Sequence, residues 1–276
     1  MAELGKYNTL KVVELVDFGV YLDDGNMGKI LMPKRYVPSG CKIDDEVDVF
    51  VYLDSEDRPV ATTEKPAATV DEFAFLKVVS VTQVGAFLDW GLAKDLLVPF
   101  REQKMRMEKD RWYVVHIHID VETNRIVGSA KIEKYLDNLP PDYKVGQEVE
   151  ILVCGKTDLG FNAIINNSHF GVLYQNEIFK PIRVGERTKA YIKKVREDEK
   201  IDLLLDKPGH LKLDSLAQAV FDALEKNNGF LPLGDKTDPD TIYSMLGMSK
   251  KNFKKAIGTL YRMQRIVIED KGIRLK

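Results

Sequence analysis

Six basic side chains stand close together near the end of this 276-residue sequence, within residues 249–265, which contain no Asp or Glu. They are Lys250, Lys251, Lys254, Lys255, Arg262 and Arg265. Cations at this density can neutralise successive phosphates of a nucleic acid and release its bound counterions. A solvated helix face usually mixes the two signs, often as i,i+4 pairs. The run therefore favours phosphate contact, with an ordinary solvated face as the alternative.

Aromatic residues beside glycines form a second candidate set. Phe18 and Tyr21 straddle Gly19, and Phe87 follows Gly85 in a similar stretch. Rings exposed on the strands of a small barrel stack unpaired bases, and each stack contributes about 1–3 kcal/mol without strict sequence preference. The alternative is that these rings belong to the core, where strand aromatics are common.

Residues that could support catalysis are sparse. His116 and His118 share a strand face at i,i+2, but no third metal ligand is apparent nearby, so we expect a surface pair. Acidic residues at 44–46 and 197–199 suit solvated turns better than a two-metal site. The sequence contains no Gly-Lys-Ser/Thr loop, Gly-x-Ser-x-Gly elbow or Cys-x-x-Cys pair. We predict a binding protein that is not an enzyme and needs no cofactor or metal.

An internal repeat indicates how these residues are positioned. Residues 10–23 align with residues 76–89, with 7 of 14 positions identical. Each copy has a β-rich run interrupted by glycine, where we expect a strand bulge or bend. A short apolar run, a strand with period-two alternation, a polar turn and a closing strand follow. Such a unit predicts a small closed five-stranded barrel of the OB type.

A third, more diverged copy follows, and then the periodicity becomes helical. Leu216 to Leu224 carry one apolar helical face, Asp238 before Pro239 resembles a helix N-cap, and Ser249 would cap a third helix. Two short β-type runs around residues 270–272 complete a hairpin. Three helices and a terminal hairpin predict a winged helix-turn-helix.

The predicted fold class is therefore mainly β with a C-terminal α+β domain: three tandem barrels of the OB-fold type followed by a winged helix. We place the domains at residues 1–66, 67–138, 143–209 and 212–276, separated by proline- and glycine-containing linkers, one of them at 207–210. Counted over residues 1–66, 67–142, 143–211 and 212–276, the net charges are −5, −2, +1 and +4, so a polyanion would be drawn towards the C-terminal half.

The composition argues against a membrane-spanning protein and against a disulfide-linked protein. With 44% hydrophobic and 30% charged residues the chain can form several cores, and no apolar run is long enough to span a membrane. Its two cysteines, Cys41 and Cys154, fall in different repeats, so we expect no disulfide. We expect a cytoplasmic monomer.

The repeats also resemble a known family. Residues 18–22, Phe-Gly-Val-Tyr-Leu, are similar to the signature of the S1 RNA-binding domain. Position by position, this resemblance assigns the binding surface of the first copy to Phe18, Tyr21, Met32, Asp54 and Arg58, and that of the second to Val84, Phe87, Val98, Asp120 and Arg125. It assigns Leu159, Asn162, Tyr174 and Lys200 in the third copy. The histidine usual in the second apolar run of S1 domains is absent from all three copies.

The chain resembles the conserved virulence factor B (CvfB) family over essentially its whole length. The resemblance rests on three S1-like units followed by a winged helix, and on the segment 247–261 at the join of its last two helices. The resemblance implies single-stranded RNA binding in the bacterial cytoplasm, with effects on gene expression and no enzymatic activity. The expected RNA-binding residues are Phe18, Tyr21, Arg58, Phe87, Arg125, Tyr174, Lys193, Lys200, Lys250, Lys251, Lys254, Lys255, Arg262 and Arg265.

Two alternatives stay open. The winged helix could read duplex DNA as a transcription regulator, with Asn252 as the available amide among lysines. Lysine-rich contact without amide or guanidinium forks fits backbone tracking better. The domains could also form a scaffold for a protein partner.

Overall fold

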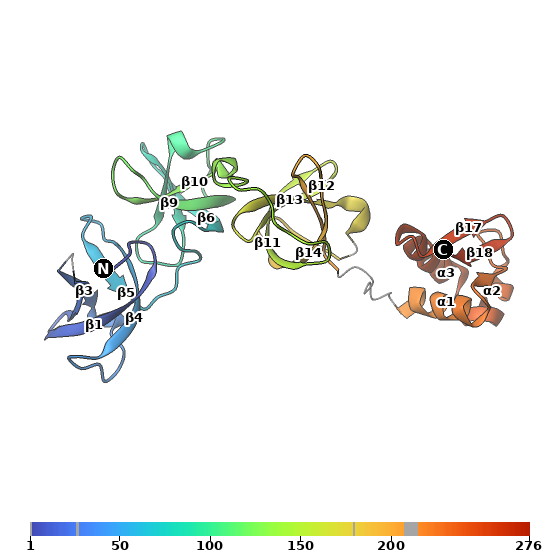
Figure 1. Cartoon of the computed structure of the whole chain (residues 1–276), viewed down its shortest axis with the longest axis horizontal. Coiled ribbons are helices and arrows are strands. Elements are labelled where there is room, and N and C mark those ends of the chain that lie inside the picture. Colours follow the sequence, from blue (N-terminus) through green and yellow to red (C-terminus); the bar gives the residue numbers. More distant parts are fainter. Residues whose placement is uncertain (1, 26–27, 179, 207–214) are drawn as a thin grey trace.

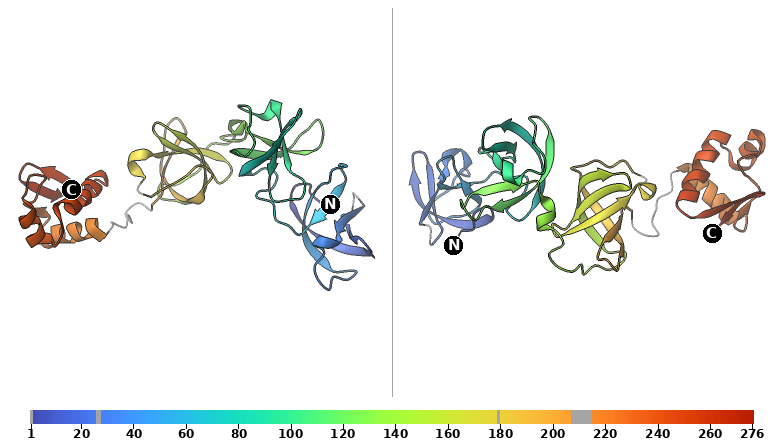
Figure 2. Two further views of the ribbon diagram at one scale, coloured as in Figure 1. Left: turned by 180° about the vertical axis from the view of Figure 1, so that it is seen from behind. Right: turned by 90° about the horizontal axis from the view of Figure 1, so that it is seen from above.

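The computed structural model describes residues 2–25, 28–178, 180–206 and 215–276. Three closed barrels are followed by a domain of three helices and a small sheet, in the order of the sequence (Figures 1 and 2). This confirms the predicted fold class. The predicted linker at 207–210 lies outside the described residues. The domain limits stay predictions, and the strands and helices of each domain fall within them.

The first barrel contains β1 (Tyr7–Val16), β2 (Gly19–Asp23), β3 (Lys29–Pro33), β4 (Glu46–Leu53) and β5 (Pro59–Thr62), with a 3-10 helix, η1 (Lys34–Tyr36), after β3. The strand order is β1-β2-β3-β5-β4 and the barrel is closed, with β3 and β5 parallel. Val12, Leu22, Ile30 and Val49 fill the interior. Alternation along each strand turns one set of side chains inward, which produces this core.

The second and third barrels repeat this arrangement. The second contains β6 (Phe73–Val81), β7 (Gly85–Asp89), β8 (Leu96–Pro99), η2 (Phe100–Glu102), β9 (Trp112–Ile119), β10 (Ile126–Ser129) and η3 (Ile132–Tyr135). The third contains β11 (Glu148–Thr157), β12 (Gly160–Ile165), β13 (His169–Tyr174), η4 (Gln175–Glu177), β14 (Arg187–Val195) and β15 (Ile201–Leu204). The diverged third repeat thus keeps the barrel topology.

The repeated glycine has a different role from the one predicted. Gly19, Gly85 and Gly160 each begin the second strand of a barrel instead of interrupting a strand. A Cβ atom on Gly19 would collide with the carbonyl oxygen of Met32 on the neighbouring strand. A register shift lies in the first strand of each barrel, between Val12 and Glu14 in the first, and the third barrel has another between Ile192 and Lys194. The glycine therefore permits close strand approach, and the preceding strand carries the irregularity.

Barrels one and two share a core. Along β4, Val49 and Val51 face the interior, in line with the predicted period-two alternation, but Phe50 and Tyr52 on the opposite face are buried as well. The Phe50 ring meets the Trp90 ring edge-on, with centroids 5.8 Å apart. The outer face of this strand is therefore an interdomain contact.

Barrels two and three meet through a second apolar contact. Phe73, Ile132, Leu136, Leu152 and Ile164 form a buried cluster between them. Beside it, the ring of His116 lies 3.8 Å from the ring of Tyr135 in a stacked arrangement, centroid to centroid. The expectation of a surface histidine pair was wrong for His116, which is buried because the third barrel and η3 cover this side of β9. The described residues hold no group of three or more His, Cys, Asp or Glu that could bind a metal ion.

The last domain contains α1 (Ser215–Lys226), β16 (Phe230–Leu231), α2 (Pro239–Leu246), α3 (Lys250–Arg262), β17 (Ile266–Glu269) and β18 (Gly272–Leu275). Both predicted caps form: Asp238 accepts hydrogen bonds from the backbone N–H of Asp240 and Thr241, and Ser249 accepts one from Asn252. The short strand β16, which was not predicted, adds a third strand to the hairpin. Both cysteines are free thiols. No helix within the described ranges is long and apolar enough to cross a membrane.

Candidate nucleic-acid interface

Helix α3 presents its predicted basic face to solvent. Its apolar side, including Phe253 and Leu260, is buried in the core of the domain, and the lysines stand on the opposite side. Lys251, Lys255 and Arg262 are exposed. A Cβ atom built on Gly258 would have no atom within 4 Å outside the helix's own backbone, so Gly258 does not relieve crowding within the domain. A ligand backbone can approach the helix closely at this point.

Three of the six predicted cations have local partners. Lys254 forms an exposed ion pair with Asp235 at 3.2 Å, the Arg262 Nε–H donates to the carbonyl oxygen of Gly258, and Arg265 lies over the ring of Phe221. Exposed contacts of this kind are worth about 0–1 kcal/mol, so a phosphate can displace them. Lys250 is half-buried at the start of the helix. Lys251 and Lys255 are exposed and, among the described residues, form no ion pair, so within α3 they are the cations least engaged by the protein itself.

Two exposed rings in this domain were not predicted from the sequence. Tyr243 on α2 is 66% exposed and Tyr261 on α3 is 55% exposed. Tyr261 follows Gly258 by three positions and so lies on the neighbouring part of the same helix face. An exposed ring beside cations can stack an unpaired base. The signal was present in the sequence as a tyrosine preceding Arg262, within the basic segment.

In the first barrel the predicted aromatic pair lies outside the core. Phe18 is 57% exposed, Tyr21 is half-buried, and the two rings meet edge-to-face with centroids 6.4 Å apart. The strand register places Leu31 opposite Tyr21 and Pro33 opposite Gly19, so these residues share the outer face. Met32, which the resemblance placed on that surface, is fully buried, and so is its counterpart Val98. The predicted and the observed outward-facing positions differ by one residue along the strand, and a shift of one residue moves a side chain to the opposite face.

Arg58 is held by its own turn. Its Nε–H and Nη2–H groups donate to Oδ2 of Asp54 at 2.9 and 2.8 Å, and the backbone N–H groups of Glu56 and Arg58 donate to Oδ1. Burial opposes ionisation of Asp54, but these hydrogen bonds prevail and hold its pKa below the usual range. The Asp54–Arg58 pair therefore fixes the β4–β5 turn, which leaves Arg58 less available to a phosphate.

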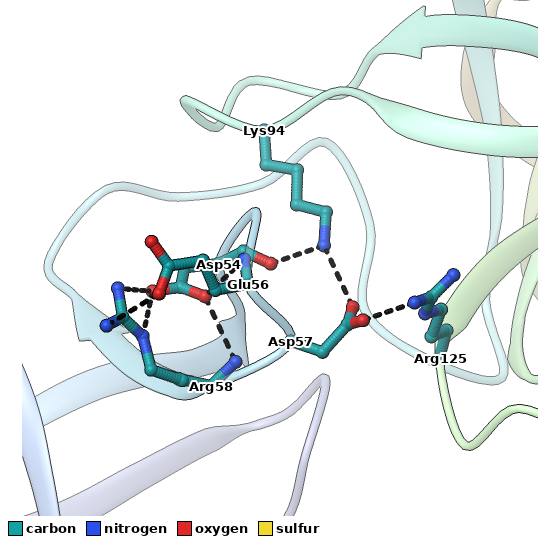
Figure 3. A network of polar contacts seen from close by, with 6 residues as sticks. All are labelled: Asp54, Glu56, Asp57, Arg58, Lys94 and Arg125. Carbon is teal, nitrogen blue, oxygen red and sulfur yellow. Dashed lines mark hydrogen bonds and ion pairs between the residues drawn. The ribbon is translucent and has the colours of Figure 1, made fainter.

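The second barrel uses the corresponding arginine differently. Arg125 forms an ion pair with Asp57 in the turn of the first barrel, and Lys94 reaches both the Asp57 carboxylate and the Asp54 carbonyl oxygen (Figure 3). Asp120 instead binds Arg101 at 2.7 Å. Phe87 is half-buried and lines a cavity at this contact. The predicted site residues Phe87 and Arg125 thus lie at an interdomain junction, which the sequence did not indicate.

The third barrel brings together a different set. The Tyr174 hydroxyl accepts a hydrogen bond from Arg196, whose guanidinium also lies above the tyrosine ring and pairs with Asp202 at 2.8 Å. Lys193 pairs with Glu177 at 2.5 Å and Lys200 with Asp198 at 2.8 Å. Tyr174 is half-buried and occupies the position that Pro33 has in the first barrel, because it lies opposite Gly160. Arg196 was not among the predicted site residues.

Comparison with known proteins identifies two of the domains. A model of the S1 domain matches residues 4–64, and a model of the CvfB-like winged helix domain matches residues 218–275. The Bacillus subtilis protein YitL, described as uncharacterized, is 28% identical over 277 residues, covering 96% of this chain and 91% of that protein.

Conserved virulence factor B of Staphylococcus saprophyticus is 28% identical over 243 residues, covering 85% of this chain and 81% of that protein. A crystal structure from Streptococcus pneumoniae, described as a multidomain protein with nucleic acid binding domains, aligns over 99% of this chain and 98% of that chain, with 24% identity and a TM-score of 0.45. The matches to family models and relatives confirm the predicted resemblance to conserved virulence factor B.

Proposed function

We propose that this chain, a relative of the conserved virulence factor B proteins with S1 and winged helix domains, binds single-stranded RNA without catalysing a reaction on it. It would act as a bacterial cytoplasmic regulator of gene expression at the RNA level. The observation that carries the proposal is the exposed basic face of α3, where residues 249–265 contain six cations and no acid. Such a face attracts a polyanion and makes its binding depend on salt.

Each domain would contribute a different kind of contact to the RNA. Lys251 and Lys255 on α3 neutralise phosphates, and Tyr174 with Arg196 adds a ring and a cation on the third barrel. Phe18 and Tyr21 offer stacking surfaces on the first barrel. Arg58 and Arg125 contribute less, because each has a carboxylate partner within the protein.

Two features favour unpaired RNA over duplex DNA. Rings on barrel strands stack bases only when the bases are not already stacked within a duplex. The basic face of α3 consists mainly of lysines, which act as point charges and follow a phosphate backbone, whereas base reading requires amide or guanidinium forks. Asn252 at the start of α3 is the exposed amide on which a DNA-reading function would depend.

The test is a titration of fluorescently labelled oligouridylate and of a DNA duplex of equal length, each at two salt concentrations. We expect tighter binding of oligouridylate, with an affinity that falls steeply as salt rises. Tighter binding of the duplex would replace the proposal with a transcription regulator. Shortening of the oligouridylate during incubation would show a nuclease and contradict the non-catalytic role.

A further inference from the structure

A cavity of about 240 Å³ lies where the first two barrels meet. The first barrel contributes the turn between β4 and β5, including Ser55 and Asp57. The second barrel contributes Phe87, Trp90, Lys94 and Asp95. Small-molecule sites commonly occupy about 300–1,000 Å³ and often form between domains. This cavity lies just below that range, so it suits one nucleobase better than a longer ligand.

The aromatic part of the cavity is held in place by the packing behind it. Trp90 is almost fully buried, and its Nε1–H donates to the carbonyl oxygen of Lys94 at 2.6 Å. The Phe50 ring packs against Trp90 from the first barrel. Phe87 remains half-buried, with part of its surface open to the cavity. The cavity therefore offers a ring for stacking on a rigid support, as a base-binding site requires.

Asp95 supplies a polar group that the fold itself does not use. Asp95 is one of the residues that line the cavity, and among the described residues its carboxylate accepts no hydrogen bond and forms no ion pair. Partial burial, with the nearby charge of Asp89, raises the pKa of Asp95. Partial burial removes part of the water that would otherwise solvate this carboxylate. A ligand with N–H groups would compensate for this loss.

The charges at the rim make an isolated phosphate a poor ligand. Lys94 and Arg125 both reach Asp57, as Figure 3 shows, and Asp95 adds a second carboxylate. Two cations thus face two anions, so the rim has no net charge. A neutral planar ring with N–H donors fits this surface better than an anion.

We propose that this cavity binds a guanine base of single-stranded RNA, which stacks against Phe87 while the Asp95 carboxylate accepts hydrogen bonds from guanine N1–H and the N2 amino group. Guanine presents two adjacent donors on its Watson–Crick edge. Adenine and cytosine place an acceptor beside their amino group, and uracil has one N–H between two carbonyl groups. The inference deepens the proposed function, since it adds a base preference to a protein that binds RNA.

Trp90 lines the cavity, so its fluorescence can report binding there. The chain has two tryptophans, so a Trp112→Phe variant leaves Trp90 as the only one. Phenylalanine can keep the stacking that Trp112 makes with Phe75. In this variant, titration with guanosine monophosphate should change the Trp90 fluorescence saturably. The affinity should exceed that for uridine monophosphate at least about tenfold, since hydrogen bonds to a charged group are worth this much.

Adding Asp95→Asn to this variant should weaken guanosine monophosphate binding at least about tenfold and abolish the preference, because the amide places a donor where guanine needs an acceptor. Asp110→Asn is the matched control: Asp110 is an exposed aspartate of the same barrel, outside the cavity, with a positive φ of 65° that asparagine tolerates. It should leave the titration unchanged. Phe87→Leu, which keeps the apolar volume but removes the ring, should weaken binding of guanosine monophosphate as a second, independent variant.

Equal responses to the guanosine and uridine nucleotides, or an Asp95→Asn variant that still prefers guanine, would overturn the inference. A parallel titration separates this failure from failure of the proposed function. Oligouridylate contains no guanine, so Asp95→Asn should bind it like the parent. If oligouridylate does not bind the parent, the RNA-binding proposal fails, and the mononucleotide titration still decides whether the cavity holds guanine.

Discussion

The guanidinium of Arg125 in the second barrel forms an ion pair with the carboxylate of Asp57 in the first. In the first barrel the arginine at the corresponding position, Arg58, turns back onto Asp54 of its own turn. One sequence pattern thus serves two purposes, a local turn in one repeat and a contact between repeats in the next. Because Lys94 reaches the same turn, the side chains of Asp57, Lys94 and Arg125 link the two barrels by polar contacts (Figure 3).

We expect this ion pair to contribute little to stability by itself. Arg125 is 52% exposed and Asp57 36% exposed at the side chain, and exposed pairs typically give about 0.2–1 kcal/mol. A double-mutant cycle with Asp57→Asn and Arg125→Gln, measured by urea unfolding, should return a coupling free energy in that range. A coupling of several kcal/mol would show that polar contacts hold the barrels together.

The apolar contact should matter far more. Trp90 is buried and meets Phe50 across the two barrels. Trp90→Ala should lower the free energy of unfolding by about 3–5 kcal/mol, because it leaves a cavity in the shared core. Trp112→Ala is the control, since Trp112 is half exposed and its truncation should cost less. Equal destabilisation of the two variants would contradict a shared core.

We expect His116 to make the stability of the folded protein sensitive to acid. Burial, followed by the neighbouring His118, lowers the pKa of His116 to about 4 in the folded protein. In the unfolded chain its pKa is near 6.5, so between pH 6.5 and 4 the unfolded state binds the extra proton. Stability should therefore fall as pH drops through this window, with no contribution from His116 above it.

The matched variant is His116→Phe, which keeps a ring against Tyr135 and Phe73 but cannot take up a proton. The free energy of unfolding should depend less steeply on pH for the variant than for the parent. The difference in slope should correspond to at most one bound proton. Identical slopes for the two proteins would show that His116 does not titrate on unfolding.

Much of the fold was predictable because its signals are local. Alternation along strands and the caps Asp238 and Ser249 each act within a few residues, and the barrels and helices formed where expected. The repeated glycine was expected to bend a strand and instead begins one, where it permits close strand approach. Strand register is less local: Met32 was placed on the outer face and lies in the core, one residue away from the outward-facing Pro33.

Contacts between domains could not be predicted. In the sequence, Phe50 and Tyr52 alternate with the core valines of β4, which is the pattern of residues that face solvent. In the structure they are buried because the second barrel packs against them. The partners of Arg125 and the unpaired Asp95 likewise depend on how two barrels meet. The cavity beside Trp90 follows from that junction, and nothing in the sequence of a single repeat indicates it.

The most direct test of RNA binding by the winged helix is the salt dependence of affinity in a Lys251→Glu, Lys255→Glu double variant. We predict an affinity for oligouridylate lower by an order of magnitude or more, and a plot of log affinity against log salt that is flatter by about 0.7 for each phosphate that is no longer neutralised. Lys42→Glu with Lys109→Glu, an equal charge change at exposed lysines outside the winged helix, should change both quantities much less. If the α3 variant binds with the parent's affinity and slope, the winged helix is not part of the RNA site.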